Sequence, residues 1–290
     1  MQVRHLVWIV LASLALFGSP AMAQSDNPID SETPKTIGVF GDSLADGMWV
    51  GLRYHLSRDD RVGTIEQLSE VSTGLSNWVY KDVSDKTQDQ LTQGRYDIAV
   101  VMFGANDMQG IRDNEGGIHS FRSESWEAIY RERIDLLINQ FKDHGADVYW
   151  IGLPTMRSQR YDGNVQFLNT LFEERAEAAG ITFVPTRRES AWEDGRYSAF
   201  LPDSEGVDRL ARVGDGVHFT LYGYRRIAAP VVDAIEYGLD NPGYQTASAD
   251  TDAEQALNVF EMTRDGELWI CHRQPDAEAA LDAVTIAPPR

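Results

Sequence analysis

Cysteine is almost absent from this chain. Cys271 is the only one among the 290 residues, so no disulfide bond can form within the chain. Long apolar runs are also missing. The apolar stretch at residues 6–17 is shorter than the roughly 20 residues that a helix needs to cross a bilayer. The sequence therefore predicts neither an intrachain disulfide nor a stable membrane anchor.

Basic residues are scarce relative to acidic ones. The chain has 26 lysines and arginines against 45 aspartates and glutamates, which gives a formal net charge of -19 and a pI near 4.6. So acidic a surface repels nucleic acids and anionic membranes, and neither is an expected partner. Hydrophobic residues make up 42% of the chain and charged residues 24%, which is typical of a globular protein with a sizeable core.

The first residues have the pattern of a secretory signal peptide. Arg4 and His5 form a weak basic region, the apolar stretch follows, and Ala21-Met22-Ala23 supplies an A-x-A cleavage site. We therefore expect a signal peptide at residues 1–23 and a periplasmic or secreted protein. No cysteine lies at the predicted cleavage site, which argues against a lipoprotein anchor. The alternative is that the N-terminal segment is not cleaved and acts as an anchor. Residues 24–34, which follow the predicted cleavage site, are predicted to be a flexible leader.

Strand and helix patterns alternate along the middle of the chain. Short apolar runs predict strands at 35–40, 63–71, 97–103, 147–153 and 181–185. Apolar residues at helical spacing predict helices at 46–55, 125–144, 164–179 and 221–237, with Ser125 as the cap of the second. Segments 108–124 and 186–213 are expected to be loops. This alternation predicts an α/β protein in which about five parallel strands lie between two layers of helices.

A serine follows the first predicted strand at a turn. The apolar run ends at Gly41, then come Asp42 and Ser43, and the chain leads directly into the first predicted helix. In a parallel sheet, reactive groups collect where strands end and helices begin. Backbone N–H groups and the helix dipole favour negative charge there, so Ser43 could attack a carbonyl and stabilise the oxyanion with its own N–H. The alternative is that Ser43 only caps the helix.

Three further segments carry the residue types that such a serine needs. Gly74 follows the second predicted strand, and Asn106 follows the third. Asp215 and His218 precede the last helix, three residues apart. A serine hydroxyl needs a base, which a histidine supplies at neutral pH, and a carboxylate can orient the imidazole. The N–H groups of Ser43 and Gly74 and the side-chain amide of Asn106 are candidate oxyanion donors.

Each of these segments also has a structural reading. Asn106 and Asp107 could form an ordinary turn, and Asp215 and His218 could cap the last helix. Asp107 could orient a loop, and we give it no catalytic role.

Together the four segments resemble the motif blocks of the SGNH, or GDSL-type, hydrolases. They are Gly41-Asp42-Ser43-Leu44, Gly74, Gly104-Ala105-Asn106-Asp107 and Asp215-Gly216-Val217-His218, in this order along residues 35–237. The chain also resembles an exported bacterial subfamily through residues 72–75, 150–154 and 215–220. This resemblance implies a flavodoxin-like three-layer α/β/α fold. It also implies that no metal or organic cofactor takes part.

The resemblance assigns a role to each candidate residue. It implies Ser43 as the nucleophile, His218 as the base and Asp215 as the acid that orients it. It implies Ser43, Gly74 and Asn106 as the oxyanion donors. We therefore expect an exported serine esterase that hydrolyses an O-acyl ester, in particular an O-acetyl ester, through an acyl-serine intermediate. The expected substrate is an ester-bearing envelope or secreted glycan, or a small acyl ester.

Two other functions use the same sequence features. A periplasmic O-acyltransferase would need the same three catalytic residues, and motifs do not separate it from an esterase. A non-catalytic envelope binding protein could keep the fold, although the intact Ser43, Asn106, Asp215 and His218 argue against it.

The hydrolase domain is expected at residues 35–240, followed by a linker and a C-terminal appendage at 241–290. Two short apolar segments, 259–262 and 268–271, flank Arg264-Asp265-Gly266 and predict a hairpin. Trp49, Trp78 and Trp126 could stack on sugars, but packing in the core or at its rim is the favoured interpretation.

Overall fold

The computed structural model describes residues 33–78, 82–113, 115–242, 259–264 and 267–272. The predicted signal peptide, nearly all of the predicted leader and most of the C-terminal appendage lie outside these residues. Within them, no helix is long and apolar enough to cross a membrane.

A five-stranded parallel sheet forms the centre of the domain, in the order β2-β1-β3-β6-β7. The strands are β1 (Lys35–Gly41), β2 (Val62–Gln67), β3 (Ile98–Met102), β6 (Asp147–Ile151) and β7 (Thr182–Val184). Every residue of β3 is buried, as expected of a central strand that is covered on both faces. The prediction of about five parallel strands is confirmed.

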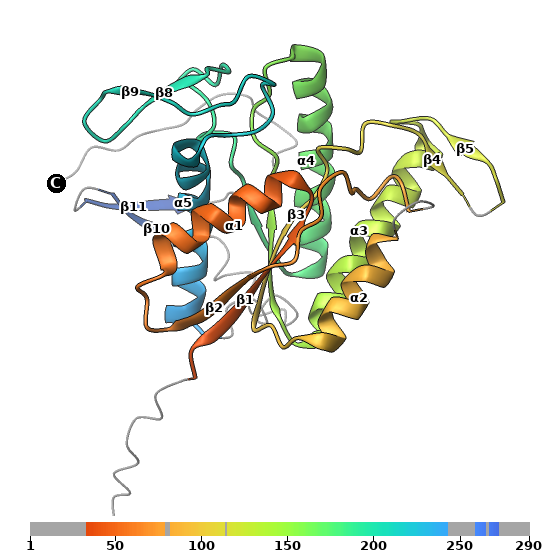
Figure 1. The fold of residues 1–290 in the computed structure, drawn as a ribbon, viewed down its shortest axis with the longest axis horizontal. Helices are drawn as coiled ribbons and strands as arrows, with labels where there is room; N and C mark the ends of the chain where they lie inside the picture. The colour runs from red at the N-terminus through yellow and green to blue at the C-terminus, as the bar shows by residue number, and fades with distance from the viewer. Residues whose placement is uncertain (1–32, 79–81, 114, 243–258, 265–266, 273–290) are drawn as a thin grey trace, which may run out of the picture. The chain divides into compact units, whose positions relative to one another are not determined.

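Helices cover both faces of this sheet. They are α1 (Ser43–Leu56), α2 (Val83–Gln93), α3 (Glu124–His144), α4 (Gln159–Ala179) and α5 (Leu221–Asp240). α1 packs against α5 on one face, while α2, α3 and α4 pack in a row on the other (Figure 1). The three-layer α/β/α fold is therefore the one that the sequence predicts.

The strand order determines where a ligand would bind. β1 lies between β2 and β3, and the chain leaves β1 through α1 on one face of the sheet but leaves β3 through α3 on the other. In open α/β sheets, ligands bind at the carboxyl ends of the strands beside such a switch point. Ser43 follows β1 directly and Asn106 lies just beyond β3. The fold thus places both residues at the expected binding position.

Two glycines let α1 and α5 approach closely. A Cβ at Gly47 would lie 1.9 Å from the ring of Tyr224, and a Cβ at Gly51 would lie 2.6 Å from the Tyr224 carbonyl oxygen. Only glycine leaves room for α5 at this distance. α1 begins at Ser43 and α5 begins three residues after His218, so this close packing holds the two side chains near each other.

We expect Gly51→Ala to destabilise the protein. In an open helix position the change from glycine to alanine adds about 0.8–1.0 kcal/mol of stability. Here the new methyl group meets the backbone of α5, and overpacking of this kind costs about 1–3 kcal/mol. The free energy of unfolding from urea titration measures the change. Gly163→Ala in α4 is the matched control, since a Cβ there meets nothing within 4 Å, and it should raise stability instead.

The sequence did not predict α2. Its apolar content is low, and its core-facing side chains, Val83, Thr87 and Leu91, recur at every fourth position with a threonine among them. The cap of this helix was visible in the sequence, because Asp82 accepts hydrogen bonds from the N–H groups of Ser84 and Asp85. A single apolar pair is too weak a periodic signal to outweigh the charged residues around it.

Helix starts differ from the predictions by a few residues. Ser123, not Ser125, caps α3 by accepting a hydrogen bond from the N–H of Trp126. α4 begins at Gln159 behind a Ser158 cap, five residues before the predicted start. The end of α3 matches the prediction: His144 is its last residue, and Gly145 follows in the left-handed conformation at φ 85°.

Both segments predicted as loops contain a short hairpin. β4 (Ile111–Arg112) pairs with β5 (Ile118–His119), and β8 (Phe200–Pro202) pairs with β9 (Asp208–Leu210). These hairpins leave the end of the sheet at which β1 and β3 finish (Figure 1). The predicted C-terminal hairpin is present as β10 (Val259–Arg264) paired antiparallel with β11 (Glu267–His272).

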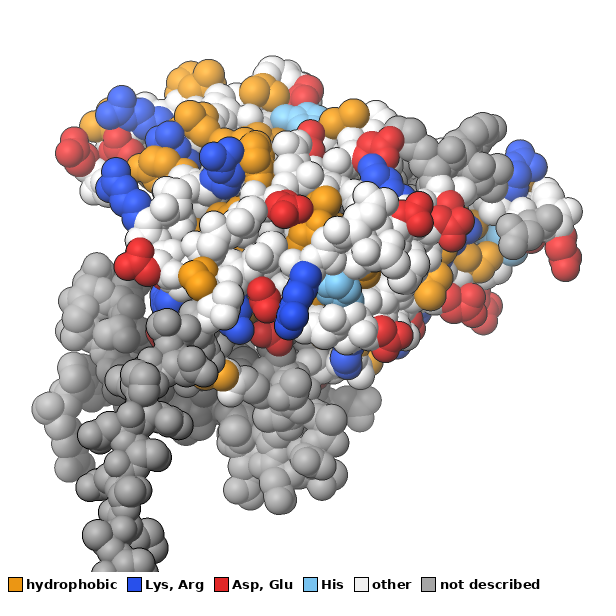
Figure 2. Space-filling model, turned by 60° about the horizontal axis from the view of Figure 1, so that its bottom comes forward, with side chains coloured by type: hydrophobic (Ala, Val, Ile, Leu, Met, Phe, Trp, Pro, Cys, Tyr) orange, Lys and Arg blue, Asp and Glu red, His pale blue; other side chains and the backbone are white. Residues whose placement is uncertain are grey.

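Charges of both signs are mixed on the face of the molecule that Figure 2 shows. Figure 2 shows acidic and basic side chains interspersed on one face, with apolar side chains between them. The exclusion of nucleic acid, which rests on net charge, stays a prediction.

Candidate active site

A chain of hydrogen bonds joins three of the predicted site residues. Ser43 Oγ lies 2.7 Å from His218 Nε2, and His218 Nδ1 lies 2.7 Å from Asp215 Oδ2. Ser43 comes from the start of α1, whereas the other two come from the loop before α5, in which His218 lies 175 residues further along the chain. The hydroxyl is partly buried and the imidazole is 34% exposed. A substrate can therefore reach both groups from solvent.

Asp215 is held in its ionised form. Its Oδ1 accepts hydrogen bonds from the backbone N–H groups of Val217 and His218, at 2.8 and 3.0 Å. Partial burial acts to raise the pKa of Asp215, but these bonds and the one to the imidazole outweigh it and lower the pKa to about 2. A carboxylate that stays charged at neutral pH fixes the imidazole with its Nδ1 proton toward Asp215. Nε2 is then free to accept a proton from Ser43.

The residue that caps α1 is not the one considered from the sequence. Asp42, not Ser43, caps α1, because its Oδ1 accepts the N–H of Leu44 at 2.9 Å. The hydroxyl of Ser43 is thus left for His218. Gly41 precedes this turn at φ 148°, and a Cβ there would lie 2.0 Å from the Met102 carbonyl oxygen. Only glycine permits so close an approach of β1 to β3 at the site.

Each of the three predicted oxyanion donors keeps an N–H without an acceptor in the described part of the chain. Within the described residues, the backbone N–H groups of Ser43 and Gly74 have no hydrogen-bond acceptor. The side-chain amide of Asn106 donates one N–H to the Thr73 carbonyl at 2.8 Å, which leaves its second N–H unused. This bond also ties Asn106 to the residue before Gly74. The structure thereby links the second and third predicted segments directly.

Asp107 anchors the loop that carries Gly74. Its buried carboxylate accepts hydrogen bonds from the N–H groups of Leu75 and Ser76, from the Ser76 hydroxyl and from the Tyr130 hydroxyl, at 2.8–3.0 Å. A Cβ at Gly74 would lie 2.3 Å from Asp107 Oδ1, so the carboxylate fits only against glycine. The ordinary-turn reading of this segment is therefore incomplete, and the suggestion that Asp107 orients a loop is supported by these bonds.

Asp42 connects the nucleophile turn to the Asn106 loop. Its second oxygen accepts the N–H of Ala105 at 3.1 Å. Burial raises the pKa of Asp42 to about 7, against the hydrogen bonds from Leu44 and Ala105, and the nearby charge of Asp107 adds to the rise. Tyr161 braces the same loop from α4, since its hydroxyl donates to the Ala105 carbonyl. Sequence reasoning assigned no role to Asp42 or Tyr161, because both act through contacts between distant segments.

Contacts in the structure decide the remaining alternatives, namely which residue caps α5 and whether the tryptophans pack in the core. Thr220, not Asp215 or His218, caps α5 by accepting the N–H of Gly223 at 3.3 Å. Trp126 is fully buried and stacks on Tyr130 with ring centroids 4.4 Å apart, and Trp49 and Trp78 pack partly buried against the core. The packing interpretation of the three tryptophans is thus confirmed.

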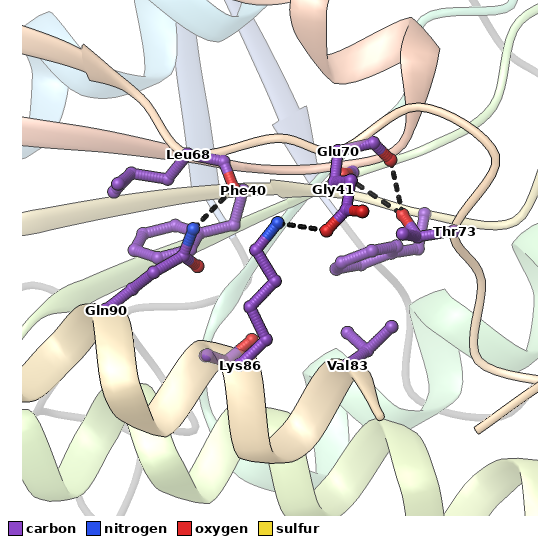
Figure 3. A pocket seen from close by; sticks show the side chains of 10 residues that line it. Phe40, Gly41, Leu68, Glu70, Thr73, Val83, Lys86 and Gln90 are labelled. Atoms are coloured by element: carbon purple, nitrogen blue, oxygen red, sulfur yellow. Dashed lines mark hydrogen bonds and ion pairs between the residues drawn. The ribbon is translucent and has the colours of Figure 1, made fainter. Parts of the chain in front are cut away.

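One small hollow is lined by residues next to the site segments, Gly41 and Thr73 among them, but by none of the predicted site residues themselves. It sits between the end of β1, the segment after β2 and α2, and Figure 3 shows Lys86 paired with Glu70 and Gln90 bonded to the Leu68 carbonyl in its wall. Its volume of about 10 Å³ holds at most one water molecule. It is too small for an ester substrate.

No group of three or more His, Cys, Asp or Glu side chains is placed to hold a metal ion in the described ranges.

Solved structures with this fold come from several enzymes. A candidate acylhydrolase from Bacteroides fragilis superposes with a TM-score of 0.50 at 16% identity, over 71% of this chain and 88% of its own. An acetyl xylan esterase gives a TM-score of 0.50 at 17% identity, over 69% and 99%. An alpha/beta hydrolase enzyme from the metagenome of Lake Arreo, Spain, gives 0.51 at 15% identity, over 69% and 94%. At these identities the likeness shows the fold.

A curated relative matches a smaller part of the chain. Threonine–tRNA ligase from Mycolicibacterium smegmatis is 25% identical over 115 residues, which is 39% of this chain. The chain covers only 17% of that ligase, so nothing about the activity of the ligase follows for this protein.

The family profile covers most of the described domain. Residues 36–234, from the second residue of β1 into α5, match the family described as "Protein of unknown function (DUF459)". The chain belongs to this family, and its fold is that of the SGNH hydrolases.

Proposed function

We propose that the protein is a serine esterase that hydrolyses an O-acyl ester through an acyl-serine intermediate. The observation that carries the proposal is the hydrogen-bonded chain from Ser43 through His218 to Asp215, beside three backbone or amide donors that can receive an oxyanion. A nucleophile, a base, an orienting acid and a donor cluster are the complete set that acyl transfer by serine needs.

The first half of the reaction forms the acyl-enzyme. Ser43 Oγ attacks the ester carbonyl carbon while its proton passes to His218 Nε2, and the carbonyl oxygen becomes an oxyanion. The N–H groups of Ser43 and Gly74 and the free amide N–H of Asn106 stabilise that charge. The bond between the carbonyl carbon and the alcohol oxygen then breaks, and Nε2 returns the proton to the departing alcohol. Asp215 stabilises the imidazolium between these two steps.

The second half releases the acyl group to water. A water molecule gives a proton to His218 Nε2 and attacks the acyl carbon. The bond to Ser43 Oγ breaks, and the serine recovers the proton from Nε2. The products are one carboxylic acid and one alcohol, and the enzyme returns to its starting state.

The proposed substrate is a short acyl ester, an O-acetyl group on an envelope or secreted glycan. The partial exposure of Ser43 and His218 at an open end of the sheet fits an ester that projects from a large polymer. The name of one fold neighbour, an acetyl xylan esterase, is consistent with this class of substrate. The proposed export rests on the signal-peptide pattern of residues 1–23.

The test is to incubate the purified protein with p-nitrophenyl acetate and with an O-acetylated glycan, and to measure released acetate and its transfer. Acetate release to water supports the esterase. Transfer to an added glycan hydroxyl in preference to water would show an acyltransferase that uses the same residues. Labelling of Ser43 by a fluorophosphonate probe, read by mass spectrometry, supports either enzyme. A protein that neither reacts with the probe nor releases acetate would be the non-catalytic binding protein.

Replacing Asn106 with alanine should lower kcat while KM changes little. The hydrogen bond from the Asn106 amide to the oxyanion forms only in the transition state. Loss of one such donor costs about 10²–10³-fold in kcat. Steady-state kinetics with p-nitrophenyl acetate measure the effect. Gln109→Ala is the control, because the bond that the Gln109 side chain makes within the described residues is to the backbone carbonyl of Asn106. An equal fall in both variants would show that the loop, not the amide, matters.

A further inference from the structure

Two arginine side chains bind the loop that carries Asp215 and His218. Arg157 lies on the segment between β6 and α4, and its two terminal nitrogens donate to the carbonyls of Gly214 and Asp215, both at 2.8 Å. Its backbone N–H donates to the Gly216 carbonyl at 3.2 Å. Arg157 is exposed, so it binds the loop from the solvent side.

Arg212 binds the next part of the same loop from inside the protein. One of its terminal nitrogens donates to the carbonyls of Gly216 and Val217, at 3.2 and 3.0 Å. The other donates to the Thr155 carbonyl at 2.7 Å, on the same inter-element segment as Arg157. Every carbonyl from Gly214 to Val217 therefore accepts a hydrogen bond from a guanidinium group.

Burial of the charged Arg212 side chain costs free energy. Its side chain is 1% exposed, its Nε has no acceptor, and no ion pair with a carboxylate forms in the described part of the chain. Burial lowers the pKa of Arg212 to about 10, so the group is still charged at neutral pH. Stacking on the Phe219 ring at 3.8 Å offsets part of the cost. An apolar side chain would fill this space at lower cost, but it could not reach three carbonyls at once.

Gly216 connects the loop to Arg157 sterically. It has a φ of 78°, and a Cβ there would lie 2.5 Å from Arg157 Cβ. Only glycine therefore fits the loop at this position beside Arg157.

We propose that Arg157 and Arg212 are positioning residues, which hold the loop from opposite sides so that Asp215 and His218 stay aligned with Ser43. This inference rests on the proposed esterase function. The loop is closed by a bridge between Arg212 and Phe219 and by a bond from the Val213 N–H to the His218 carbonyl. The two arginines bind the four carbonyls between these closing bonds, so they fix the backbone on both sides of Asp215. A shift of about 1 Å in such an alignment can cost about 10²-fold in rate.

Arg157→Ala is the decisive variant, since an exposed residue can be removed without leaving a cavity. We expect kcat for p-nitrophenyl acetate to fall about 10–100-fold with little change in KM. Added guanidinium chloride, at concentrations well below those that unfold proteins, should restore part of kcat, whereas sodium chloride at equal ionic strength should not. Arg196→Ala is the matched control, because Arg196 is exposed and its guanidinium contacts only Asp194 among the described residues.

A second variant tests the buried partner. Arg212→Lys keeps the charge but has no planar fork, so it should lower kcat in the same way. For both variants, the ¹H resonance of the His218 Nδ1 proton should shift or broaden if the bond to Asp215 is disturbed. A purely structural role would lower the free energy of unfolding without moving this resonance in the folded protein.

The outcomes separate this inference from the proposed function. Wild-type activity in Arg157→Ala with an unchanged Nδ1 resonance would overturn the positioning role, while loss of activity in Ser43→Ala would still support the esterase. A fall in kcat that guanidinium cannot restore, with an unchanged resonance, would also count against it. Wild-type protein without Ser43-dependent activity would instead refute the proposed function itself.

Discussion

Ser43→Ala should lower kcat for p-nitrophenyl acetate by about 10⁵–10⁶-fold, the scale seen when the nucleophile of a serine hydrolase is removed. The hydroxyl lies 2.7 Å from His218 Nε2, so the variant loses the only atom in this chain of hydrogen bonds that can form the acyl-enzyme. Residual activity above that of water is still expected, because the oxyanion donors remain. Stopped-flow or steady-state release of p-nitrophenol measures the change.

His218→Ala should cost about as much as Ser43→Ala, and the double variant should cost little more than either. The two side chains act as one unit, because the serine is a poor nucleophile without its base. Asp215→Asn should lower kcat by about 10⁴-fold, since an amide no longer holds the imidazole in the needed tautomer. Additive losses of kcat in the double variant would contradict the expectation that Ser43 and His218 act as one unit.

A second serine serves as the matched control for Ser43→Ala. Ser204→Ala changes an exposed serine in the turn between β8 and β9 and should leave kcat unaltered. If Ser43→Ala and Ser204→Ala are equally active, Ser43 is not the nucleophile and the esterase proposal fails.

The parts of the site that are local in sequence could be predicted. A strand that ends in Gly41 and leads into a helix places Ser43 at a sheet edge on local pattern alone. Asp215 and His218 are three residues apart, so a single loop can bring their side chains together. The parallel sheet follows from alternating periodicities in the same way.

The parts of the site that depend on distant contacts could not be predicted. Arg212 and Arg157 have no motif, and their role appears only when β6, β7 and α5 bring their flanking segments together. Asp42 looks like an ordinary helix cap until its second oxygen is seen to hold Ala105. Periodicity reports which face of an element is buried, but it does not report which polar groups meet across elements.

Sequence reasoning failed at the short elements for a related reason. β4, β5, β8 and β9 have two or three residues each, and their pairing comes from the turn and the surroundings, not from an apolar pattern. α2 shows the same weakness, since polar residues dominate its exposed side. The two hairpins leave the end of the sheet that carries Ser43, so this end is less predictable than the catalytic residues themselves.

Asp107→Ala should give the largest loss of stability among substitutions near the site. The carboxylate accepts four hydrogen bonds inside the protein, and alanine leaves the N–H groups of Leu75 and Ser76 without an acceptor. Bonds to a charged group contribute about 1.5–3 kcal/mol each, and buried donors without partners cost about 1–3 kcal/mol each. Removal of a buried charge offsets part of this loss, because burial raises the pKa of Asp107 and so disfavours its ionised form. We expect a net loss of about 3–5 kcal/mol in the free energy of unfolding.

Tyr130→Phe is the control that isolates the loop contacts. It removes one of the four bonds, leaves no donor unpaired and should cost only about 1 kcal/mol. Kinetics then separate the two variants further. Without Asp107 the loop no longer holds Gly74 in place, so kcat should fall in Asp107→Ala even where the protein is fully folded, while Tyr130→Phe should keep most of its activity. Urea titration followed by tryptophan fluorescence measures stability, and p-nitrophenyl acetate hydrolysis measures kcat. Equal stability and equal kcat in the two variants would mean that Asp107 does not anchor the oxyanion loop.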